Sequence, residues 1–325
     1  MFTENENTVQ SKPSLIYVAG AAPRSGTNYL FDLLSRHPSL GPVLEGEDYF
    51  FYKLYYLRLF VSSIFSKWRS EWKIKEQTDP DELLSSLGEG LIQFLRKKAL
   101  RCDKESSIVL TKTPHPRNLS FFSSLLERGF LVILVRDGRA VTESARRTFD
   151  DTFDDAAHRW RRGASQVLSF IDEYGWSSGW HQVVTYEDLV RDTSGKLQLL
   201  LDEIGVDFEE YPSESLEETR VIGSSTFGQE EEEVTWNTKR DDGTFNPLDR
   251  FSSWSDREHE RFDWIAGDEL RALGYSSSSV SSPTFTASLK NRVLDTRRLP
   301  ENLVRWSRSK VKTLLLSYVA DEPIS

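Results

Sequence analysis

The stretch YVAGAAPRSGTNYLFDLLSRHP, residues 17–38, joins an apolar segment, a loop of small residues and an amphipathic segment. Leu30, Leu33 and Leu34 follow the helical spacing i, i+3, i+4, and Pro38 ends that pattern. The stretch therefore predicts a strand, a loop and a helix that begins at the loop. Phosphate-binding loops have this layout, because the N–H groups at a helix N-terminus attract an anion.

The loop differs from the one that hydrolyses nucleoside triphosphates. A Walker A loop requires a lysine before its last Ser or Thr, but here Thr27 directly follows Gly26 and the loop holds no lysine. Arg24 supplies a planar cation instead, and Ser25 adds a hydroxyl donor. These residues favour an anion other than a hydrolysed triphosphate. A turn that binds no ligand is the alternative for this loop taken alone.

Further apolar runs, separated by helical patterns, predict a parallel sheet with helices on both faces. The fold class is α/β, a P-loop-like three-layer domain over residues 15–275. The predicted strands are 15–20, 107–111, 130–135 and 182–186, and the predicted later helices are 155–174, 187–204 and 257–273.

Four other segments are assigned by composition. Residues 1–14 are polar and are expected to be disordered, and 49–106 form a helical insert rich in aromatic residues. Residues 276–284 are a Ser-rich linker. Residues 285–325 are a basic C-terminal helical tail, with its helix expected around 301–319. Docking of this helix on the domain is the first interpretation, and peripheral contact with an anionic membrane is the second.

The composition limits the class of protein. The chain has 325 residues, and 41 Lys and Arg against 51 Asp and Glu give a net charge of −10, which argues against a general nucleic-acid-binding surface. Its single cysteine, Cys102, excludes a disulfide framework within one chain. No apolar run reaches the roughly 18 residues of a transmembrane helix, and the N-terminus does not resemble a secretory signal. We expect a cytoplasmic protein whose oligomeric state is not encoded in these patterns.

A second segment, FLVILVRDGRAVTESARRTF at 130–149, also indicates an anion site. An apolar strand ends at Arg136, and the next helix carries Ser144. The carboxyl ends of parallel strands form the ligand edge of such a sheet, so this pair and the first loop predict a ligand with phosphates at both ends. A surface ion pair of Arg136 with Asp137 or Glu143 is the alternative.

Together these segments resemble the sulfotransferases that use 3′-phosphoadenosine 5′-phosphosulfate (PAPS). PRSGTNYL is similar to their 5′-phosphosulfate loop, and VRDGRAVTESARRTF is similar to their 3′-phosphate segment. VVTYEDLVRDTSGKLQLLLDEIGVDF resembles a later strand and helix whose tyrosine lies near the adenine, here Tyr186. RFDWIAGDELRALGY resembles the ending of many bacterial members. Arg24, where the cytosolic enzymes carry lysine, favours the bacterial and carbohydrate-type branch.

The resemblance implies a cofactor site made from these segments. The loop would hold the 5′-phosphosulfate, and Arg136 and Ser144 the 3′-phosphate. The loop residues concerned are Arg24, Ser25, Gly26, Thr27 and Asn28. The stretch TWNTKRDDGTFN at 235–246 is a candidate for a loop that closes over the cofactor through Lys239 or Arg240.

Catalytic residues are implied in the same way. Lys112 in LTKTPHP matches the lysine that stabilises the leaving phosphate in carbohydrate-type and bacterial members. Glu47 in LEGEDYFFY matches the glutamate base of heparan-type members, with Glu45 as its rival. The cytosolic enzymes use a histidine two positions after the lysine, but here Pro114 stands there and His115 follows it. His115 is therefore the third candidate for the base.

The expected reaction moves a sulfonyl group from PAPS to a hydroxyl of a glycan, a glycolipid or a small metabolite. Adenosine 3′,5′-bisphosphate is the expected product, and no metal is required, because Arg24, Lys112 and backbone donors replace Mg²⁺. Two alternatives remain open, a P-loop nucleotide-dependent kinase and a catalytically silent nucleotide-binding protein.

Overall fold

The computed structural model describes residues 12–43, 47, 50–67, 78–100, 108–212, 220–221, 239–240, 247–248, 250–276 and 290–296. Residues 1–11, nearly all of the predicted linker, the predicted helix around 301–319 and Glu45 lie outside these residues. The main elements in chain order are β1 (Leu15–Gly20), α1 (Thr27–Ser35), β2 (Leu40–Pro42), α2 (Phe50–Lys67), α4 (Pro80–Arg96), β3 (Ile108–Thr113), η2 (Leu119–Phe121), α5 (Phe122–Leu125), β4 (Gly129–Val135), α6 (Gly138–Phe149), α7 (Phe153–Tyr174), β5 (Ser177–Ser178), β6 (His181–Thr185), α8 (Tyr186–Arg191), α9 (Thr193–Ile204), η3 (Phe208–Glu210), β7 (Arg220–Val221), β8 (Lys239–Arg240) and α11 (Asp256–Ala272).

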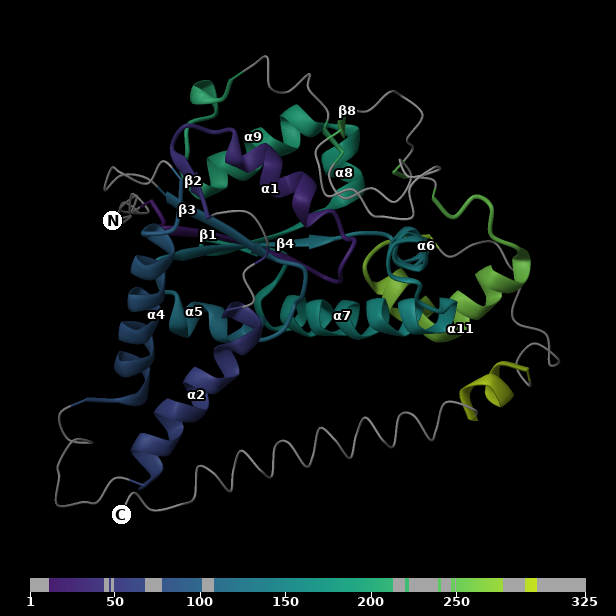
Figure 1. Ribbon diagram of the computed structural model, residues 1–325, viewed down its shortest axis with the longest axis horizontal. Helices are drawn as coiled ribbons and strands as arrows, with labels where there is room; N and C mark the ends of the chain where they lie inside the picture. The colour runs from purple at the N-terminus through teal and green to yellow at the C-terminus, as the bar shows by residue number, and fades with distance from the viewer. Residues whose placement is uncertain are drawn as a thin grey trace, which may run out of the picture.

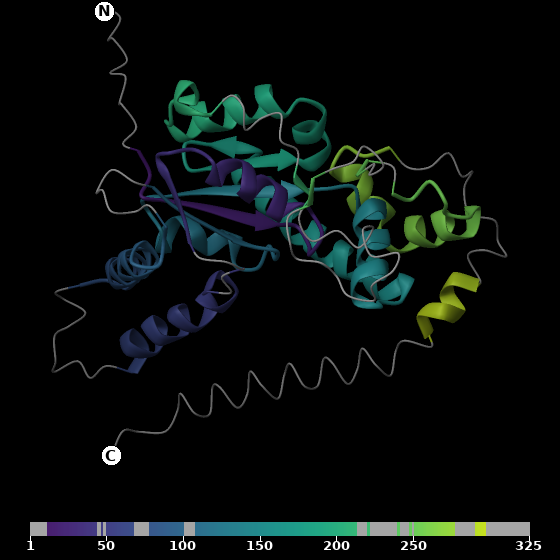
Figure 2. The same cartoon turned by 45° about the horizontal axis from the view of Figure 1, so that its top comes forward.

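The central sheet has six strands in the order β2-β3-β1-β4-β6-β5. All neighbouring strands are parallel except β5, which runs antiparallel to β6. Helices α1, α8 and α9 lie on one side of the sheet, and α4, α5 and α7 lie on the other (Figure 1). The turned view separates the same layers (Figure 2). The predicted three-layer α/β class with a largely parallel sheet is therefore confirmed.

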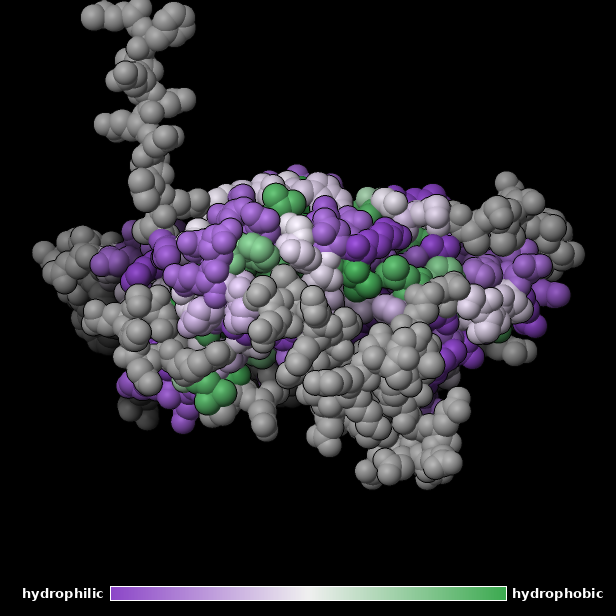
Figure 3. Space-filling model, turned by 90° about the horizontal axis from the view of Figure 1, so that it is seen from above, coloured by the Kyte–Doolittle hydropathy of each residue, from purple (hydrophilic) through white to green (hydrophobic). Residues whose placement is uncertain are grey.

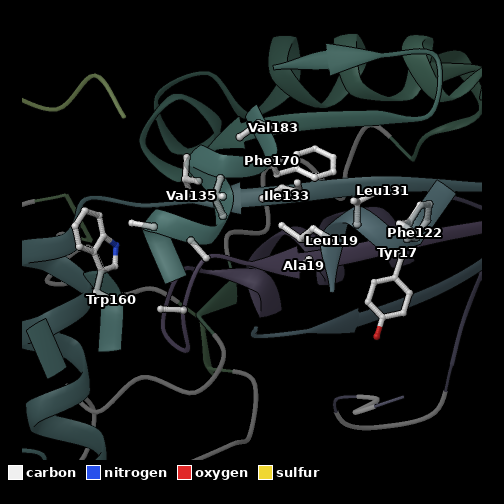
Figure 4. Close-up of a cluster of buried hydrophobic side chains, with 14 of the residues drawn as sticks. Tyr17, Ala19, Leu119, Phe122, Leu131, Ile133, Val135, Trp160, Phe170 and Val183 are labelled. Carbon is white, nitrogen blue, oxygen red and sulfur yellow. The ribbon is translucent and has the colours of Figure 1, made fainter. Parts of the chain in front are cut away.

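The central strands are apolar throughout because both faces of the sheet are covered. In β1, Leu15, Tyr17 and Ala19 point into the cluster beneath α7, whereas Ile16 and Val18 point into the cluster beneath α1. Figure 4 shows the first cluster, in which side chains of β1, β4 and α7 meet. Each fully buried Leu, Ile or Val contributes roughly 1.5–3 kcal/mol.

One predicted helix is two helices in the structure. The segment 187–204 divides into α8 and α9 at Asp192, whose φ of −140° is not helical. The Asp192 carboxylate accepts a hydrogen bond from the N–H of Gly195 and caps α9, and Thr185 caps α8 in the same way through the N–H of Asp188. The strand β2, which was not predicted, has only three residues, so it shows no alternation.

The strand order places the two predicted anion segments side by side. In the strand order, β2 and β3 lie on one side of β1, and β4 and β6 lie on its other side. The carboxyl ends of the neighbouring strands β1 and β4 therefore lie side by side at a switch point of the sheet, the position where such sheets bind ligands. The loop before α1 and the turn before α6 both leave the sheet there. Helices α2 and α4 lie between β2 and β3 in the chain.

Candidate active site

The loop after β1 has two residues with left-handed backbone conformations. Arg24 and Gly26 have left-handed φ values of 77° and 97°. A Cβ atom on Gly26 would lie 2.3 Å from the ring of Tyr186, so no side chain fits there. The Oγ of Ser25 accepts a hydrogen bond of 3.1 Å from the N–H of Ala22, which closes the turn. The turn ends at Gly26, the N-cap of α1, where the first helical N–H groups lack intrahelical acceptors.

Two arginines contact Ser144 of α6, and a third, Arg136, lies beside them. The Nε of Arg24 and the Nη1 of Arg250 each donate a hydrogen bond of 3.0 Å to the Oγ of Ser144, whose side chain is fully buried. Arg136, at the end of β4, donates from Nη1 to the carbonyl oxygen of Arg24 at 3.1 Å and from Nη2 to that of Pro247 at 2.6 Å. One small region thus holds three guanidinium groups from three distant segments of the chain.

This concentration of charge is electrostatically unfavourable without an anion. Burial, followed by the charge of Arg136, lowers the pKa of Arg24 to about 10, and the pKa of Arg250 falls to about 10 for the same two reasons. The Nε of Arg136 is buried and has no hydrogen-bond partner in the described part of the chain. A buried donor of this kind costs free energy until an acceptor reaches it. Phosphate oxygens would satisfy both the charges and the free donor.

The aromatic ring of Tyr186 packs against one of these guanidinium groups. The guanidinium of Arg136 lies 4.2 Å from the centre of the Tyr186 ring, and the ring of Tyr29 packs edge-on against it at 5.8 Å. Burial raises the pKa of Tyr186. The ring therefore fills the space between the loop glycine Gly26 and the cation at the end of β4.

The end of β4 is held by a buried network. The N–H of Asp137 donates to the Glu187 carboxylate at 3.0 Å, and the hydroxyl of Tyr275 donates to the other oxygen at 2.8 Å. Burial raises the pKa of Glu187. The Nε1 of Trp160 donates to the carbonyl oxygen of Arg136 at 3.1 Å. These contacts fix the peptide unit between Arg136 and Asp137.

A second polar group lies at the end of β3. The Nζ of Lys112 is 3.7 Å from Oε1 of Glu47, and the two side chains are 8% and 25% exposed. β3 pairs with β1, and Lys112 stands opposite Val18, so this lysine is close to the loop that follows β1. Burial lowers the pKa of Arg24 and of His115, and the charge of Glu47 offsets part of that lowering in both groups. Glu47 thus lies within electrostatic reach of three basic side chains.

The sulfotransferase family model matches residues 16–210, which include both predicted anion segments and Lys112. The chain belongs to the sulfotransferase family. It is therefore an enzyme of sulfonyl transfer.

Several solved structures are similar to this sulfotransferase. The sulfotransferase domain of the Synechococcus PCC 7002 olefin synthase is 19% identical with a TM-score of 0.49, over 84% of this chain and 99% of that one. A mouse sulfotransferase complexed with PAP is 14% identical with a TM-score of 0.44, over 80% and 84% of the two chains. Retinol dehydratase in a complex with retinol and PAP is 15% identical with a TM-score of 0.36, over 84% of each chain. No curated protein matches the chain.

The structure brings the predicted residues of this sulfotransferase into two neighbouring groups. Arg24, Arg136, Ser144 and Tyr186 form the first, beside the loop residues 25–28. The second group is formed by Glu47 and Lys112, with His115 within electrostatic reach of Glu47. Burial, followed by the charge of Arg117, lowers the pKa of His115.

The alternative role of Arg136, a surface ion pair, is not what the structure contains. Asp137 pairs with Arg139 at 2.6 Å, and Glu143 pairs with Arg147 at 2.6 Å. Arg136 is buried and directs its terminal nitrogens to two carbonyl oxygens.

Sequence reasoning missed Arg250. The predicted closing loop at 235–246 directed attention to Lys239 and Arg240, which lie in β8 and pair with β7. The signal that was available is the FSSW segment after Arg250. Its Trp254 donates from Nε1 to Glu143 at 3.0 Å, and Phe251 lies under the guanidinium of Arg139 at 4.4 Å. These aromatic anchors hold Arg250 over α6.

The described residues also bear on membrane spans and metal sites. No helix within the described ranges is long and apolar enough to cross a membrane. Within the same ranges, no group of three or more His, Cys, Asp or Glu side chains is arranged to hold a metal ion.

Proposed function

We propose that this sulfotransferase moves a sulfonyl group from PAPS to an acceptor hydroxyl. The observation that carries the proposal is that Arg24 and Arg250 both bond to Ser144 while Arg136 bonds to the backbone of Arg24. The unpartnered Nε of Arg136 and the mutual repulsion of the arginines fit a dianion such as a 3′-phosphate. Residues 24–28, at the N-terminus of α1, are then available for the phosphosulfate at the other end of the donor.

The second group of residues fits the chemistry at the sulfur. PAPS, when bound, supplies the sulfonyl group, whose bond to the 5′-phosphate oxygen breaks as the bond to the acceptor oxygen forms. Glu47 takes the proton of the acceptor hydroxyl through its carboxylate. Lys112 places its ammonium beside the oxygen that gains negative charge. The 3.7 Å between Lys112 and Glu47 puts a base and a cation in the same small volume.

The acceptor class is a hydroxyl of a glycan, a glycolipid or a small metabolite. Helix α2 begins at Phe50, shortly after Glu47, so the acceptor reaches the base beside this helix. The aromatic side chains of α2 suit the apolar faces of such acceptors.

A thermal-shift experiment tests the cofactor. Adenosine 3′,5′-bisphosphate without metal should raise the melting temperature, since ligand at about 100 times its Kd stabilises by about 2.7 kcal/mol. ATP with Mg²⁺ is the comparison. Stabilisation by ATP with Mg²⁺ alone would assign the site to a nucleotide-dependent kinase instead.

A transfer assay tests the chemistry. PAPS labelled in its sulfonyl group is offered with a panel of sugars, lipid-linked glycans and phenols, and labelled product is separated. Lys112→Met should abolish transfer while binding of adenosine 3′,5′-bisphosphate is retained. If both proteins bind the bisphosphate and neither transfers label to any acceptor, the chain is a silent nucleotide-binding protein.

A further inference from the structure

Helix α2 carries apolar side chains on the side that faces away from the protein. Leu54 and Val61 are buried on the inner side. On the other side, Tyr55, Leu59 and Phe60 are 39%, 37% and 51% exposed. A helix with one partner is normally polar on its free side, so this arrangement calls for a second partner. We call Tyr55, Leu59 and Phe60 the outer face of α2.

A basic group accompanies the outer face, and α2 itself has no acid. Its sequence, FFYKLYYLRLFVSSIFSK, contains three cations and no Asp or Glu. Lys53 is exposed and lies 5.9 Å from the Tyr56 ring, whereas the Arg58 guanidinium lies against Phe121 of η2 at 4.3 Å, on the inner side of the helix. In a chain of net charge −10, this local excess of positive charge is a departure from the average surface.

The C-terminal end of the neighbouring helix α4 also combines aromatic and basic side chains. Phe50 of α2 packs edge-on against Phe94 of α4 at 5.8 Å, so the start of α2 meets the end of α4. Lys97 and Lys98 follow there and are exposed, and Lys98 lies 5.9 Å from the Phe94 ring. The acids of α4 stand in its first turn and at Glu89, which accepts a hydrogen bond from Gln93.

The side of the molecule that carries α1 and α9 has a different surface. Seen from the side of α1 and α9, the described surface is mostly hydrophilic, and its hydrophobic residues form separate patches (Figure 3). On α9, Leu199 is a hydrophobic residue that is 58% exposed. It provides a control for the effect of removing one exposed leucine from a different layer of the fold.

We propose that the outer face of α2 is a membrane-binding surface for anionic lipid. Tyr55, Leu59 and Phe60 enter the boundary between headgroups and acyl chains, and Lys53 reaches the lipid phosphates. Aromatic and aliphatic groups with a flanking cation are the composition that binds such a surface.

A second copy of the chain fits this face less well. A twofold dimer places the same patch on both subunits, so the cations of α2 would approach one another. α2 offers no carboxylate that could pair with them across the axis. An anionic lipid surface supplies the missing negative charge without that constraint.

The membrane surface is independent of the proposed sulfonyl transfer, because vesicle binding needs neither PAPS nor an acceptor. It does bear on where the acceptor comes from. α2 begins just after Glu47, so the same helix carries the proposed membrane surface and follows directly on the Lys112–Glu47 pair.

Vesicle flotation of the full chain tests the proposal. The protein is mixed with vesicles of phosphatidylcholine and phosphatidylserine, or of phosphatidylcholine alone, and the floated fraction is measured. The wild type should float with the anionic vesicles and much less with the neutral ones. Leu59→Ser combined with Phe60→Ser should lower partitioning about tenfold or more, because two apolar side chains no longer insert. Leu199→Ser should float as the wild type does.

Two further measurements keep the outcome decisive. Lys53→Gln should reduce the preference for anionic vesicles, and melting curves of each variant report whether it is folded. The proposal is overturned if the folded Leu59→Ser, Phe60→Ser variant floats like the wild type. Vesicle binding would then not need the outer face of α2, and the basic segment 285–325 would be sufficient for it. It is also overturned if the wild type does not float but sediments as a dimer that this variant dissociates.

Discussion

Lys112 and Glu47 lie 3.7 Å apart, although they come from the end of a central strand and from the segment before α2. The pair is only partly accessible, which strengthens electrostatic interaction between the two groups relative to bulk water. A carboxylate that takes a proton and an ammonium that offsets charge on a leaving oxygen are the two requirements of sulfonyl transfer to a hydroxyl. The predictions below begin with this pair.

Glu47→Gln should lower kcat for sulfonyl transfer by about 10²- to 10⁴-fold, because the amide cannot take the acceptor proton. The KM for PAPS and the affinity for adenosine 3′,5′-bisphosphate should change little. Glu127→Gln, at an exposed position before β4, is the matched control. Steady-state kinetics with the best acceptor would measure the difference, and an unchanged kcat in Glu47→Gln would move the role of base to another group.

Arg250→Gln should weaken binding of adenosine 3′,5′-bisphosphate by roughly 10- to 100-fold, since a charge-assisted hydrogen bond contributes about 1.5–3 kcal/mol. Adenosine 5′-phosphate, which lacks the 3′-phosphate, should bind both proteins equally. Calorimetric titration of each ligand measures the two effects. Arg191→Gln, at an exposed arginine of α8, serves as control. An equal loss for both nucleotides would place Arg250 elsewhere than at the 3′-phosphate.

Gly26→Ala should destabilise the protein by about 1–3 kcal/mol and abolish nucleotide binding. The added Cβ would meet the Tyr186 ring at 2.3 Å in a backbone with φ of 97°. Gly90→Ala in α4 is the control, because nothing lies within 4 Å of the added atom there and alanine favours a helix. Denaturant unfolding compares them. If Gly26→Ala were as stable as the wild type, the Tyr186 ring would move away from the added Cβ atom at no cost in free energy.

Stability should fall as the pH decreases from 7 towards 5. Burial lowers the pKa of His115, His181 and His259 from the usual 6.5, so the unfolded chain takes up protons first. The carboxyl group of Glu187 has the opposite effect on stability. Because burial raises its pKa above the ordinary 4.5, it stabilises the folded state below pH 4.5, and this stabilisation is lost as the pH rises through the pKa of the folded state. Unfolding in urea at a series of pH values measures the slope.

His115→Asn should make that slope shallower, because one of the three histidines no longer titrates. It should also retain most sulfonyl transfer if Glu47 is the base. A variant with the wild-type pH slope would show that His115 has the same pKa in the folded and unfolded states.

Much of the fold could be predicted because the central strands are continuous apolar runs bounded by turn residues. The strand before Gly20 and the helix after Gly26 were found for this reason, and so was the turn at Arg136. The break at Asp192 was overlooked, although an aspartate three residues before Gly195 is a recognisable helix cap. Arg250 was missed because no periodic pattern surrounds it. Contacts with α6, distant in the sequence, determine its position.

The contact between Arg24 and Ser144 joins the loop after β1 to helix α6. Arg24 contributes its backbone at the N-terminus of α1 and its side chain at Ser144. In the proposed site, this one residue would set the distance between the 5′-phosphosulfate and the 3′-phosphate. We expect such a site to select nucleotides by how far apart their charged groups stand, so that a chain of adjacent phosphates such as that of ATP would fill only one end.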